Sequence, residues 1–346
     1  MHEFINGNFK EKIYMNVNNS QLAYFLCGGT GINVGVALKG DSKTDNNKSA
    51  FFVGLDSSSA NSSHGLFEIE YMVKVGSPDE KTQGSGKVKA TNYPQAEQFV
   101  AQTLAKHKPR PYNVVVCNTA GGTGSMLGFV LARTLLAQGH LVVLCLINDM
   151  TSQVEMSNAV GSLRSFANQT GPNFLDTVIP YLEFNNTLEN TRGEVNSNIV
   201  DKLNILSLFL TGENGEMDYQ DVKNLLSYSK HYGVPAALSR IRFFDADAVA
   251  QFTGKVPVAV ASLFKDSNSV IPRFNGTVIR STGVFAKDVA RPKNTDELHM
   301  VLDHGEALQE LEQKMKELDD RKVASSSTFV QQKDLSAGAD ASGFVP

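Results

Sequence analysis

The chain has 346 residues, with 32 Lys and Arg against 36 Asp and Glu and a formal net charge of −4. This length predicts two domains and a tail, and the slightly acidic balance argues against a nucleic-acid-binding surface spread over the molecule. No apolar leader opens the chain, and its longest apolar run, over 141–147, is too short to span a bilayer. We therefore expect a soluble, intracellular protein. The cysteines lie within apolar runs, which favours buried, reduced thiols over disulfides or metal ligands: Cys27, Cys117 and Cys145.

The first half of the chain alternates between apolar runs of strand length and segments with apolar residues at helical spacing. It begins with a polar extension over 1–20. Strands are predicted at 22–27, 50–55, 113–117, 141–147 and 177–184. Helices are predicted at 31–38, 94–106, 126–135 and 155–169. This alternation predicts an α/β fold with a parallel, doubly wound sheet that binds ligands at the carboxyl ends of its strands.

The pattern changes after a long apolar-periodic helix predicted over 194–210. A helix over 219–232 then leads to strand-like runs that predict a smaller, strand-rich domain: 236–243, 255–264 and 277–285. A long acidic helix with one apolar stripe is predicted over 295–322. The Ser/Ala/Gly-rich segment over 325–346 is expected to be disordered when the protein is alone.

Two glycine-rich loops of similar make each follow a predicted strand and each precede a predicted helix. The first runs Gly28-Gly29-Thr30-Gly31-Ile32-Asn33, and the second runs Ala120-Gly121-Gly122-Thr123-Gly124-Ser125. Glycine lets backbone N–H groups approach an anion closely, and a helix N-terminus adds a positive dipole. One such loop is a weak signal, but two in one chain indicate that both converge on a polyphosphate. The sequence therefore predicts a nucleotide-binding protein.

Two common phosphate-binding templates fit poorly. No stretch supplies the Gly-x-x-x-x-Gly-Lys-Ser/Thr pattern, which excludes the ordinary P-loop NTPases. Both loops lack the third glycine or alanine of the Gly-x-Gly-x-x-Gly/Ala dinucleotide fingerprint. Asp56, placed after the second strand where a ribose-binding acid would stand, keeps a Rossmann-type NAD(P)-dependent oxidoreductase as an alternative.

A third template fits better. The second loop resembles the signature loop of the tubulin/FtsZ superfamily, whose core is Gly-Gly-Thr-Gly-Ser/Thr, here with Ala120 in place of its first glycine. Three further segments resemble that family's first phosphate loop, the start of its central helix and its catalytic loop: 27–34, 193–196 and 216–222. The order and spacing match over about 22–285, and the short chain with its acidic end is most similar to the tubulin-like proteins of large bacteriophages.

The resemblance implies a Rossmann-like parallel-sheet GTPase domain, a central helix, a smaller mixed α+β second domain, and a C-terminal helix with a tail. The implied boundaries are 1–20 for the extension, 21–193 for the GTP-binding domain, 194–212 for the central helix, 213–292 for the second domain and 293–346 for the acidic helix and tail. It also implies GTP or GDP with Mg²⁺ as ligands. The expected partners are further copies of the chain in a head-to-tail filament, with no direct nucleic-acid or membrane partner.

In the host bacterial cytoplasm, such filaments would position phage DNA and capsids. The tail of one subunit would dock on the next, and exposed acids would meet a basic patch there: Glu310, Glu312, Glu317, Asp319 and Asp320. A helix that merely packs on the body is the competing interpretation. A tubulin-like protein that assembles without hydrolysis is a further alternative to the GTPase.

The resemblance also assigns ligand contacts. The phosphates would meet the two loops: Gly28, Gly29, Thr30, Gly31, Asn33, Gly121, Gly122, Thr123, Gly124 and Ser125. A γ-phosphate-sensing loop would supply Gly84, Ser85 and Gly86, with Thr82 and Lys87 as neighbours, although a solvated loop explains this segment equally well. Asp56 would lie near magnesium, or would cap a turn. Asn196 would bind the guanine edge, with a second contact from Asn185 or Asn186. Phe184 is a candidate to stack on the base, or a core residue.

Asp218 and Asp221 are the predicted catalytic residues. They stand at the start of a predicted helix, three positions apart, so both carboxylates face the same end. An N-cap acid with a second acid at the third helical position stabilises any helix, so the pattern also has a structural explanation. The resemblance implies that these acids press against the γ-phosphate bound by the neighbouring subunit. They would orient the attacking water, which ties hydrolysis to assembly.

Overall fold

A computed structural model of the chain describes residues 20–40, 47, 49–73, 93–169, 178–211, 216–229, 238–253, 256–271, 273–286, 291–292, 295–317 and 320. The strands are β1 Leu22–Cys27, β2 Phe51–Asp56, β3 Glu68–Tyr71, β4 Tyr112–Asn118, β5 Leu141–Asp149, β6 Ile179–Asn186, β7 Leu238–Asp245, β8 Ala259–Phe264, β9 Ile279–Val284 and β10 Glu297–His304. The helices are α2 Gly28–Gly40, α4 Tyr93–Lys106, α5 Thr123–Ala137, α6 Gln153–Gln169, α7 Arg192–Leu210, α8 Tyr219–Leu226 and α10 Ala246–Ala250. Residues 307–317 are also helical.

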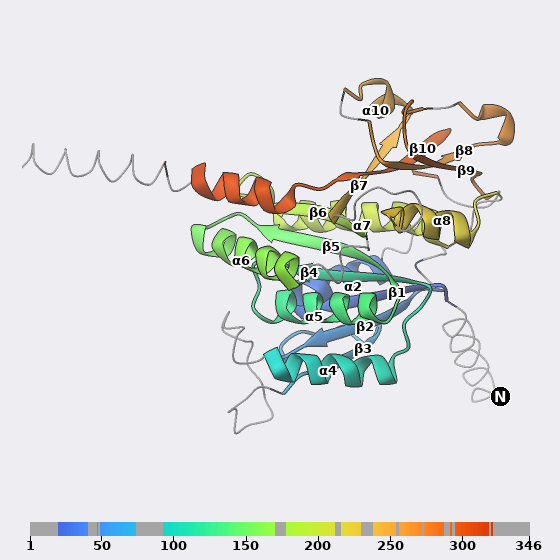
Figure 1. The fold of residues 1–346 in the computed structure, drawn as a ribbon. Coiled ribbons are helices and arrows are strands. Elements are labelled where there is room, and N and C mark those ends of the chain that lie inside the picture. The colour runs from blue at the N-terminus through green and yellow to red at the C-terminus, as the bar shows by residue number, and fades with distance from the viewer. Residues whose placement is uncertain are drawn as a thin grey trace, which may run out of the picture.

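The described strands form one sheet in the order β3-β2-β1-β4-β5-β6-β7-β10-β8-β9 (Figure 1). Every neighbouring pair is parallel except the two pairs that β10 makes with β7 and β8. The carboxyl ends of the parallel strands therefore face one end of the molecule, and their amino ends face the other.

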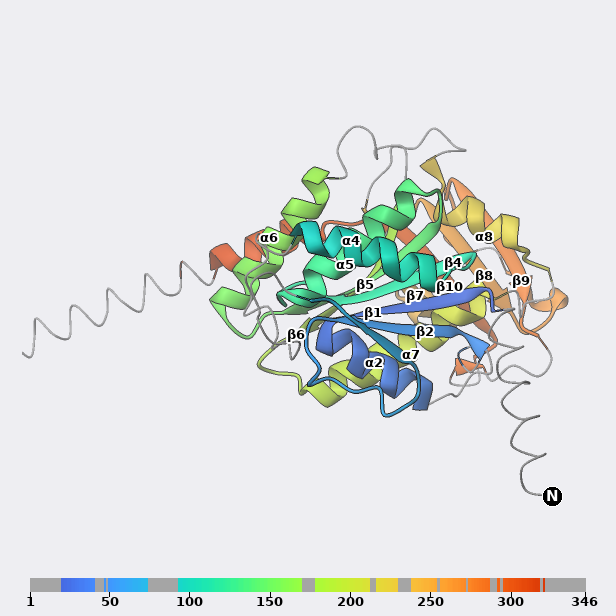
Figure 2. The same cartoon turned by 90° about the horizontal axis from the view of Figure 1, so that it is seen from below.

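Helices cover both faces of the sheet's first half. Helices α4, α5 and α6 lie on one face, and α2 and α7 lie on the other (Figure 2). Each face has its own buried cluster, with apolar residues of α2 and α7 in one and of α4, α5 and α6 in the other. This explains the unbroken apolar runs of β1 and β5, because a parallel strand covered on both faces has no solvent side to alternate toward.

The two halves of the sheet meet at a short junction. Strand β6 pairs with β7 over only three residue pairs, from Ile179 with Leu238 to Tyr181 with Arg240. Beyond this point the two strands separate. The strands of the predicted second domain therefore continue the same sheet through a narrow connection.

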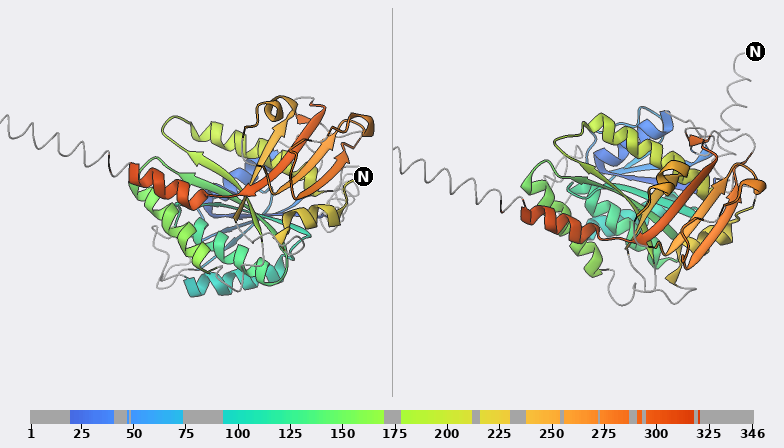
Figure 3. Two further views of the ribbon diagram at one scale, coloured as in Figure 1. Left: turned by 45° about the horizontal axis from the view of Figure 1, so that its top comes forward. Right: turned by 90° about the horizontal axis from the view of Figure 1, so that it is seen from above.

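The predicted helix over 295–322 is wrong in its first part. Residues Glu297–His304 form β10, which lies between β7 and β8, and only 307–317 are helical. Helix 307–317 lies beside α6 (Figure 3), and Arg164 of α6 pairs with Glu312 at 2.6 Å. The apolar stripe that suggested a helix includes residues of a strand buried on both faces, where no alternation is visible. Pairing with two neighbouring strands decides its structure.

Other elements differ less from the prediction. Helix α8 ends at Leu226 with Ser227 as its C-cap, and the predicted end at Tyr232 lies outside the described residues. The short strand β3 was not predicted. The three cysteines are buried and free, as expected. Most of the 1–20 extension and all of the 325–346 tail lie outside the described residues. Within the described part of the chain, every helix is too short or too polar to cross a membrane.

Candidate functional site

The two glycine loops pack directly on each other at the carboxyl ends of β1 and β4. These strands are neighbours, with Cys27 beside Cys117. Gly28 has φ +72°, and a Cβ there would lie 2.8 Å from the Cα of Gly124. A Cβ on Gly124 would in turn lie 2.8 Å from the carbonyl oxygen of Cys27. Glycine is therefore required at both contact points, and the predicted convergence of the loops is present.

The loops present the N-termini of α2 and α5 at this end of the sheet. Helix α2 begins at Gly28 and α5 at Thr123, so the first-turn N–H groups of both helices lack partners within their helix. The N–H of Gly121 donates to the backbone oxygen of Asn118 at 3.3 Å and to its side-chain Oδ1 at 3.2 Å. The Ser125 hydroxyl is buried and donates back to the carbonyl oxygen of Gly121. Both residues thus shape the loop from within.

Asp56 ends β2 and is 2% exposed. Its carboxylate accepts hydrogen bonds from the N–H of Ser57 at 2.7 Å and from Nδ2 of Asn61 at 2.6 Å. Burial raises the pKa of Asp56, and these hydrogen bonds act against the increase. The Asn61 side chain lies against the first glycine loop, since a Cβ on Gly29 would be 2.8 Å from its Oδ1. Ser57 continues the contact to the second loop through a 2.7 Å hydrogen bond between its hydroxyl and that of Thr123.

A pocket of about 160 Å³ opens beside the loops. It is lined by Thr30, Asn33, Asn118, Ile147, Asp149, Asn186, Arg192, Val195 and Asn196. Thr30 and Asn33 come from α2, four lining residues lie at or near the ends of β4, β5 and β6, and three lie in the first turns of α7. The predicted contacts Thr30, Asn33 and Asn196 thus meet in one hollow at the carboxyl end of the sheet. Asn118, Asp149 and Arg192 line it as well and were not predicted.

The pocket includes Asn186 and not Asn185. The Oδ1 atom of Asn185 accepts a hydrogen bond from Nδ2 of Asn148 at 3.0 Å, on the opposite side of β6. Successive strand residues point to opposite faces, so only one of the two asparagines can face the pocket. Phe184 is 6% exposed and belongs to the buried core, which agrees with the structural interpretation of this residue.

A capping box fixes the start of α7. The N–H of Glu194 donates to Oγ1 of Thr191 at 3.2 Å, and the N–H of Thr191 donates to Oε2 of Glu194 at 2.8 Å. The box satisfies two N–H groups of the first turn and sets where the helix begins. Residues 192, 195 and 196 therefore fall on the turn that borders the pocket.

Asp218 and Asp221 form a second capping box, at the start of α8. The N–H of Asp221 donates to Oδ1 of Asp218 at 3.0 Å, and the N–H of Asp218 donates to Oδ2 of Asp221 at 3.1 Å. The structural explanation of the pair thus holds. Asp218 is exposed and Asp221 is half-buried, and the capping bonds use one oxygen of each carboxylate.

The acidic pair lies at the end of the sheet opposite to the pocket. The hydroxyl of Tyr112, the first residue of β4, donates to the carbonyl oxygen of Tyr219 at 3.4 Å, and the two rings are 5.3 Å apart. Asn118, the last residue of β4, lines the pocket. Seven strand residues separate the two ends by roughly 20 Å. The acids and the pocket of one molecule therefore cannot act on the same bound group.

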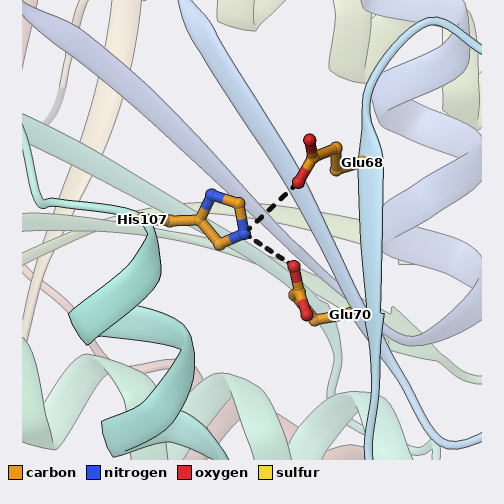
Figure 4. A group of neighbouring side chains, drawn as sticks. All are labelled: Glu68, Glu70 and His107. Atoms are coloured by element: carbon orange, nitrogen blue, oxygen red, sulfur yellow. Dashed lines mark hydrogen bonds and ion pairs between the residues drawn. The ribbon is translucent and has the colours of Figure 1, made fainter.

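A separate cluster lies near the edge strand β3. Figure 4 shows Glu68 and Glu70 of β3 facing His107, which follows α4, with 2.8 Å between Nε2 of His107 and Oε1 of Glu70. The three ligand atoms lie within 4.8 Å of one another. The ammonium of Lys106 already lies 2.6 Å from Glu70 and 3.1 Å from Glu68. Burial acts to raise the pKa of Glu70, but hydrogen bonds from His107 and Lys106 outweigh it and lower that pKa. The cluster ties α4 to β3 away from the pocket.

The remaining predicted contact residues are either not described by the structure or have partners within the molecule. Gly84, Ser85 and Gly86, with Thr82 and Lys87, lie outside the described residues, as does Asp319. Two of the acids assigned to a neighbouring subunit have partners in their own molecule. Glu310 pairs with Arg240 at 2.7 Å, and Glu312 pairs with Arg164 at 2.6 Å.

Solved structures with a tubulin-like fold resemble this arrangement of the sheet, the paired glycine loops over β1 and β4 and helix α7. No family model matches the chain. A protofilament of TubZ from bacteriophage PhiKZ aligns with a TM-score of 0.73 and 20% identity, over 89% of this chain and 93% of that one. The GDP complex of the phage tubulin PhuZ gives 0.72 and 17%, over 88% and 93%. A GTPγS-bound protofilament of CetZ2 from Haloferax volcanii gives 0.63 and 16%, over 87% and 99%.

Curated relatives specify the resemblance further. The phage tubulin-like protein of Pseudomonas phage phiKZ is 27% identical over 218 residues, which make up 62% of this chain and 63% of that protein. The phage tubulin-like protein of Pseudomonas phage PhiPA3 is 23% identical over 280 residues, or 80% of this chain and 83% of that protein. The predicted fold class and the resemblance to the phage tubulin-like proteins are confirmed.

Proposed function

We propose that this chain is a GTP-dependent polymerising protein whose subunits join head to tail, so that the acidic loop of one subunit completes the nucleotide site of the next. The observation that carries the proposal is the placement of the pocket and of Asp218 and Asp221 at opposite ends of one sheet. Stacking two copies with the same orientation brings the acids of one against the pocket of the other. Structural neighbours described as protofilaments, and others bound to GDP or GTPγS, support this assembly and this ligand.

In this proposal the two loops bind the phosphates of the nucleotide and the pocket binds its base. The first-turn N–H groups of α2 and α5 bind the phosphates, where the contacts at Gly28 and Gly124 leave no room for a Cβ. The side-chain amides of Asn186 and Asn196 offer a donor and an acceptor each to the guanine edge. Mg²⁺ bound with the nucleotide would neutralise phosphate charge. The buried carboxylate of Asp56, which already accepts hydrogen bonds from Ser57 and Asn61, would act on the ion from beside the first loop.

Asp218 and Asp221 orient the attacking water. Each carboxylate keeps one oxygen outside the capping box, and both lie at the start of α8, at the end of the sheet that would meet the adjoining subunit. A carboxylate that accepts a hydrogen bond from the water fixes its lone pair toward the γ-phosphate. The N–H groups of the two loops stabilise the charge on the transferred group. In an infected bacterium, filaments of this kind would position phage DNA and capsids, with the C-terminal tail docked on the neighbouring subunit.

The test follows light scattering and phosphate release from purified protein after addition of GTP, ATP or a slowly hydrolysed GTP analogue. We expect scattering with GTP and its analogue but not with ATP, and phosphate release with GTP. Asp221→Asn keeps an acceptor for the capping bond but removes the charge, so it should still scatter while releasing at least about 100-fold less phosphate. Asp245→Asn alters another helix-capping acid, on α10, and is the matched control.

The alternatives give different results. Scattering with GTP and no phosphate release from the wild type would identify a protein that assembles without hydrolysis. Flat scattering together with oxidation of NADH or NADPH would instead favour the dinucleotide enzyme, with Asp56 on the ribose.

A further inference from the structure

The side chains of Glu68, Glu70 and His107 form a cluster that the proposed function does not use. The two acids belong to β3, the last strand of the sheet order, and His107 follows α4, whereas the nucleotide pocket is lined from α2, α7 and the ends of β4, β5 and β6 (Figure 4). One carboxylate oxygen of each acid and one ring nitrogen of the histidine lie within 4.8 Å of one another. Two carboxylates and an imidazole are a donor set that zinc and similar transition-metal ions bind, whereas calcium and magnesium prefer oxygen ligands alone.

The fold turns both acids toward α4. Side chains two positions apart on a strand share a face, so Glu68 and Glu70 point the same way. Ile69 between them points to the other face, where a Cβ on Gly54 would lie 2.9 Å from Cγ1 of Ile69 and 3.3 Å from Cγ1 of Ile32 on α2. Packing of this isoleucine beside α2 thus holds the two carboxylates on the side of α4.

The imidazole is held in place for such a site. His107 is 8% exposed, and its ring lies 5.6 Å from that of Phe51. Its Nε2 atom is 2.8 Å from Oε1 of Glu70 and 3.8 Å from Oε2 of Glu68. Bonds of about 2.0–2.2 Å to a tetrahedral zinc ion place neighbouring ligand atoms about 3.4 Å apart, which lies between these two distances. The side chain of Glu68 is 66% exposed, so it can adjust to the ion and leaves the site open to water as a fourth ligand.

The ammonium of Lys106 shows that a positive charge is stable beside the two acids. It lies 2.6 Å from Oε1 of Glu70 and 3.1 Å from Oε2 of Glu68, the same two oxygens that face the imidazole. The lysine side chain is 58% exposed and can turn into solvent, where an ammonium is strongly hydrated. A divalent ion carries twice the charge and bonds directly to the imidazole as well, so it can replace the ammonium.

We propose that Glu68, Glu70 and His107 bind a divalent transition-metal ion of the zinc type, in exchange for the ammonium of Lys106. The ion joins the edge strand β3, which pairs only with β2 among the described strands, to the end of α4. It stabilises the folded chain, because the three ligands come together only when β3 and α4 are in place.

The test titrates Zn²⁺ and Mg²⁺ by calorimetry into the full chain, freed of metal with EDTA and without nucleotide. We expect one Zn²⁺ per chain and Mg²⁺ binding at least about 100-fold weaker. His107→Gln and Glu70→Gln should each weaken Zn²⁺ binding at least about tenfold. Lys106→Gln removes the competing cation and should tighten it severalfold. Glu97→Gln, which breaks the ion pair of α4 with Arg133 of α5, is the matched control and should leave it unchanged.

Two further readouts distinguish this site from zinc bound elsewhere. Co²⁺ in place of Zn²⁺ should give visible absorption bands that His107→Gln lacks. Added Zn²⁺ should raise the melting temperature of the wild type and not that of His107→Gln, and melting in EDTA checks that each variant is folded.

Other results would overturn the assignment. Zinc binding that survives His107→Gln, or that Mg²⁺ equals, would identify an adventitious ion only. Absence of zinc binding by the wild type would leave the cluster as an ion pair network. Unchanged affinity in Lys106→Gln would contradict the exchange, and this exposed position tests the site even where His107→Gln fails to fold. Because nucleotide is absent, none of these results depends on GTP binding.

Discussion

His299 of β10 lies where a charge on its own ring is strongly disfavoured. It is fully buried, and its Nδ1 lies 2.8 Å from the hydroxyl of Ser262. Burial lowers the pKa of His299 to about 4, with Arg273 and Arg280 acting in the same direction and Glu297 opposing them. The folded protein therefore holds this imidazole neutral.

This makes the stability of the fold sensitive to acid. The pKa of His299 is about 4 in the folded state and about 6.5 in the unfolded chain, so between these values the unfolded state binds the extra proton. Stability should fall as the pH is lowered through this window, by up to about 1.4 kcal/mol per pH unit. Urea unfolding at several pH values between 7 and 5 measures the slope. His299→Phe, among the rings of Phe264 and Phe274, should flatten it, and an unchanged slope would contradict the assignment.

Some residues of the site were predictable from the sequence and others were not. The glycines were recognisable because two similar glycine-rich loops each follow an apolar strand, and Asn196 was assigned through the resemblance of 193–196 to the start of the family's central helix. The choice between Asn185 and Asn186 depends on which face of β6 is turned to the pocket. That orientation cannot be read from a single sequence. Arg192 had a signal that could have been used, since it lies four residues before Asn196 and therefore on the same helical face.

Among the elements, helix 307–317 is attached to the body by two arginines in different surroundings. Arg240 of β7 lies 2.7 Å from both Glu183 and Glu310, and Glu183 is 7% exposed. Burial raises the pKa of Glu183, and the charge of Arg240 opposes that increase. Arg164 of α6 pairs with Glu312 on the surface, where it is 55% exposed. Helix 307–317 thus pairs through Glu310 with a largely buried arginine and through Glu312 with an exposed one.

These pairs should differ in their effect on stability. Arg240→Gln leaves the buried carboxylate of Glu183 without its cation and should lower the free energy of unfolding by on the order of 2–3 kcal/mol. Arg164→Gln removes a solvent-screened pair and should cost less than about 1 kcal/mol. Urea unfolding monitored by circular dichroism at pH 7 compares them. Equal losses in the two variants would show that Arg240 does not neutralise Glu183.

The elements themselves were predictable where one segment carries its own signal. The parallel strands of the first half are continuous apolar runs between turn signals, and α7 has a capping residue and an apolar period. Strand β10 was not predictable from its own segment, because it is formed by pairing with β8 and with β7, which lies more than fifty positions earlier. Strand β3 was not predictable because its alternation of polar and apolar residues covers only four positions, Glu68–Tyr71, which is too short to be distinguished from a loop.

At the scale of the whole molecule, a site divided between two subunits makes activity depend on concentration. If the acids of one molecule must reach the pocket of another, an isolated subunit has no complete site. Phosphate release per subunit should vanish below the scattering threshold and rise steeply above it, over an about 100-fold dilution series. A release rate per subunit that stays constant on dilution would mean that each molecule hydrolyses GTP alone, contrary to the opposed positions of Asn118 and Tyr112.

The common direction of the strands that end at the pocket has a further consequence. Contacts between unlike ends give an open chain when the rotation between subunits does not close a ring, and the two tips of an open chain differ. In the proposed filament the last pocket at one tip would have no acidic loop over it, and the nucleotide there would stay a triphosphate until another subunit arrives. Each arrival starts hydrolysis in the subunit it covers. At that tip the newest subunit would therefore be the one that still holds GTP, whereas a subunit joining at the other tip would have its pocket covered at once.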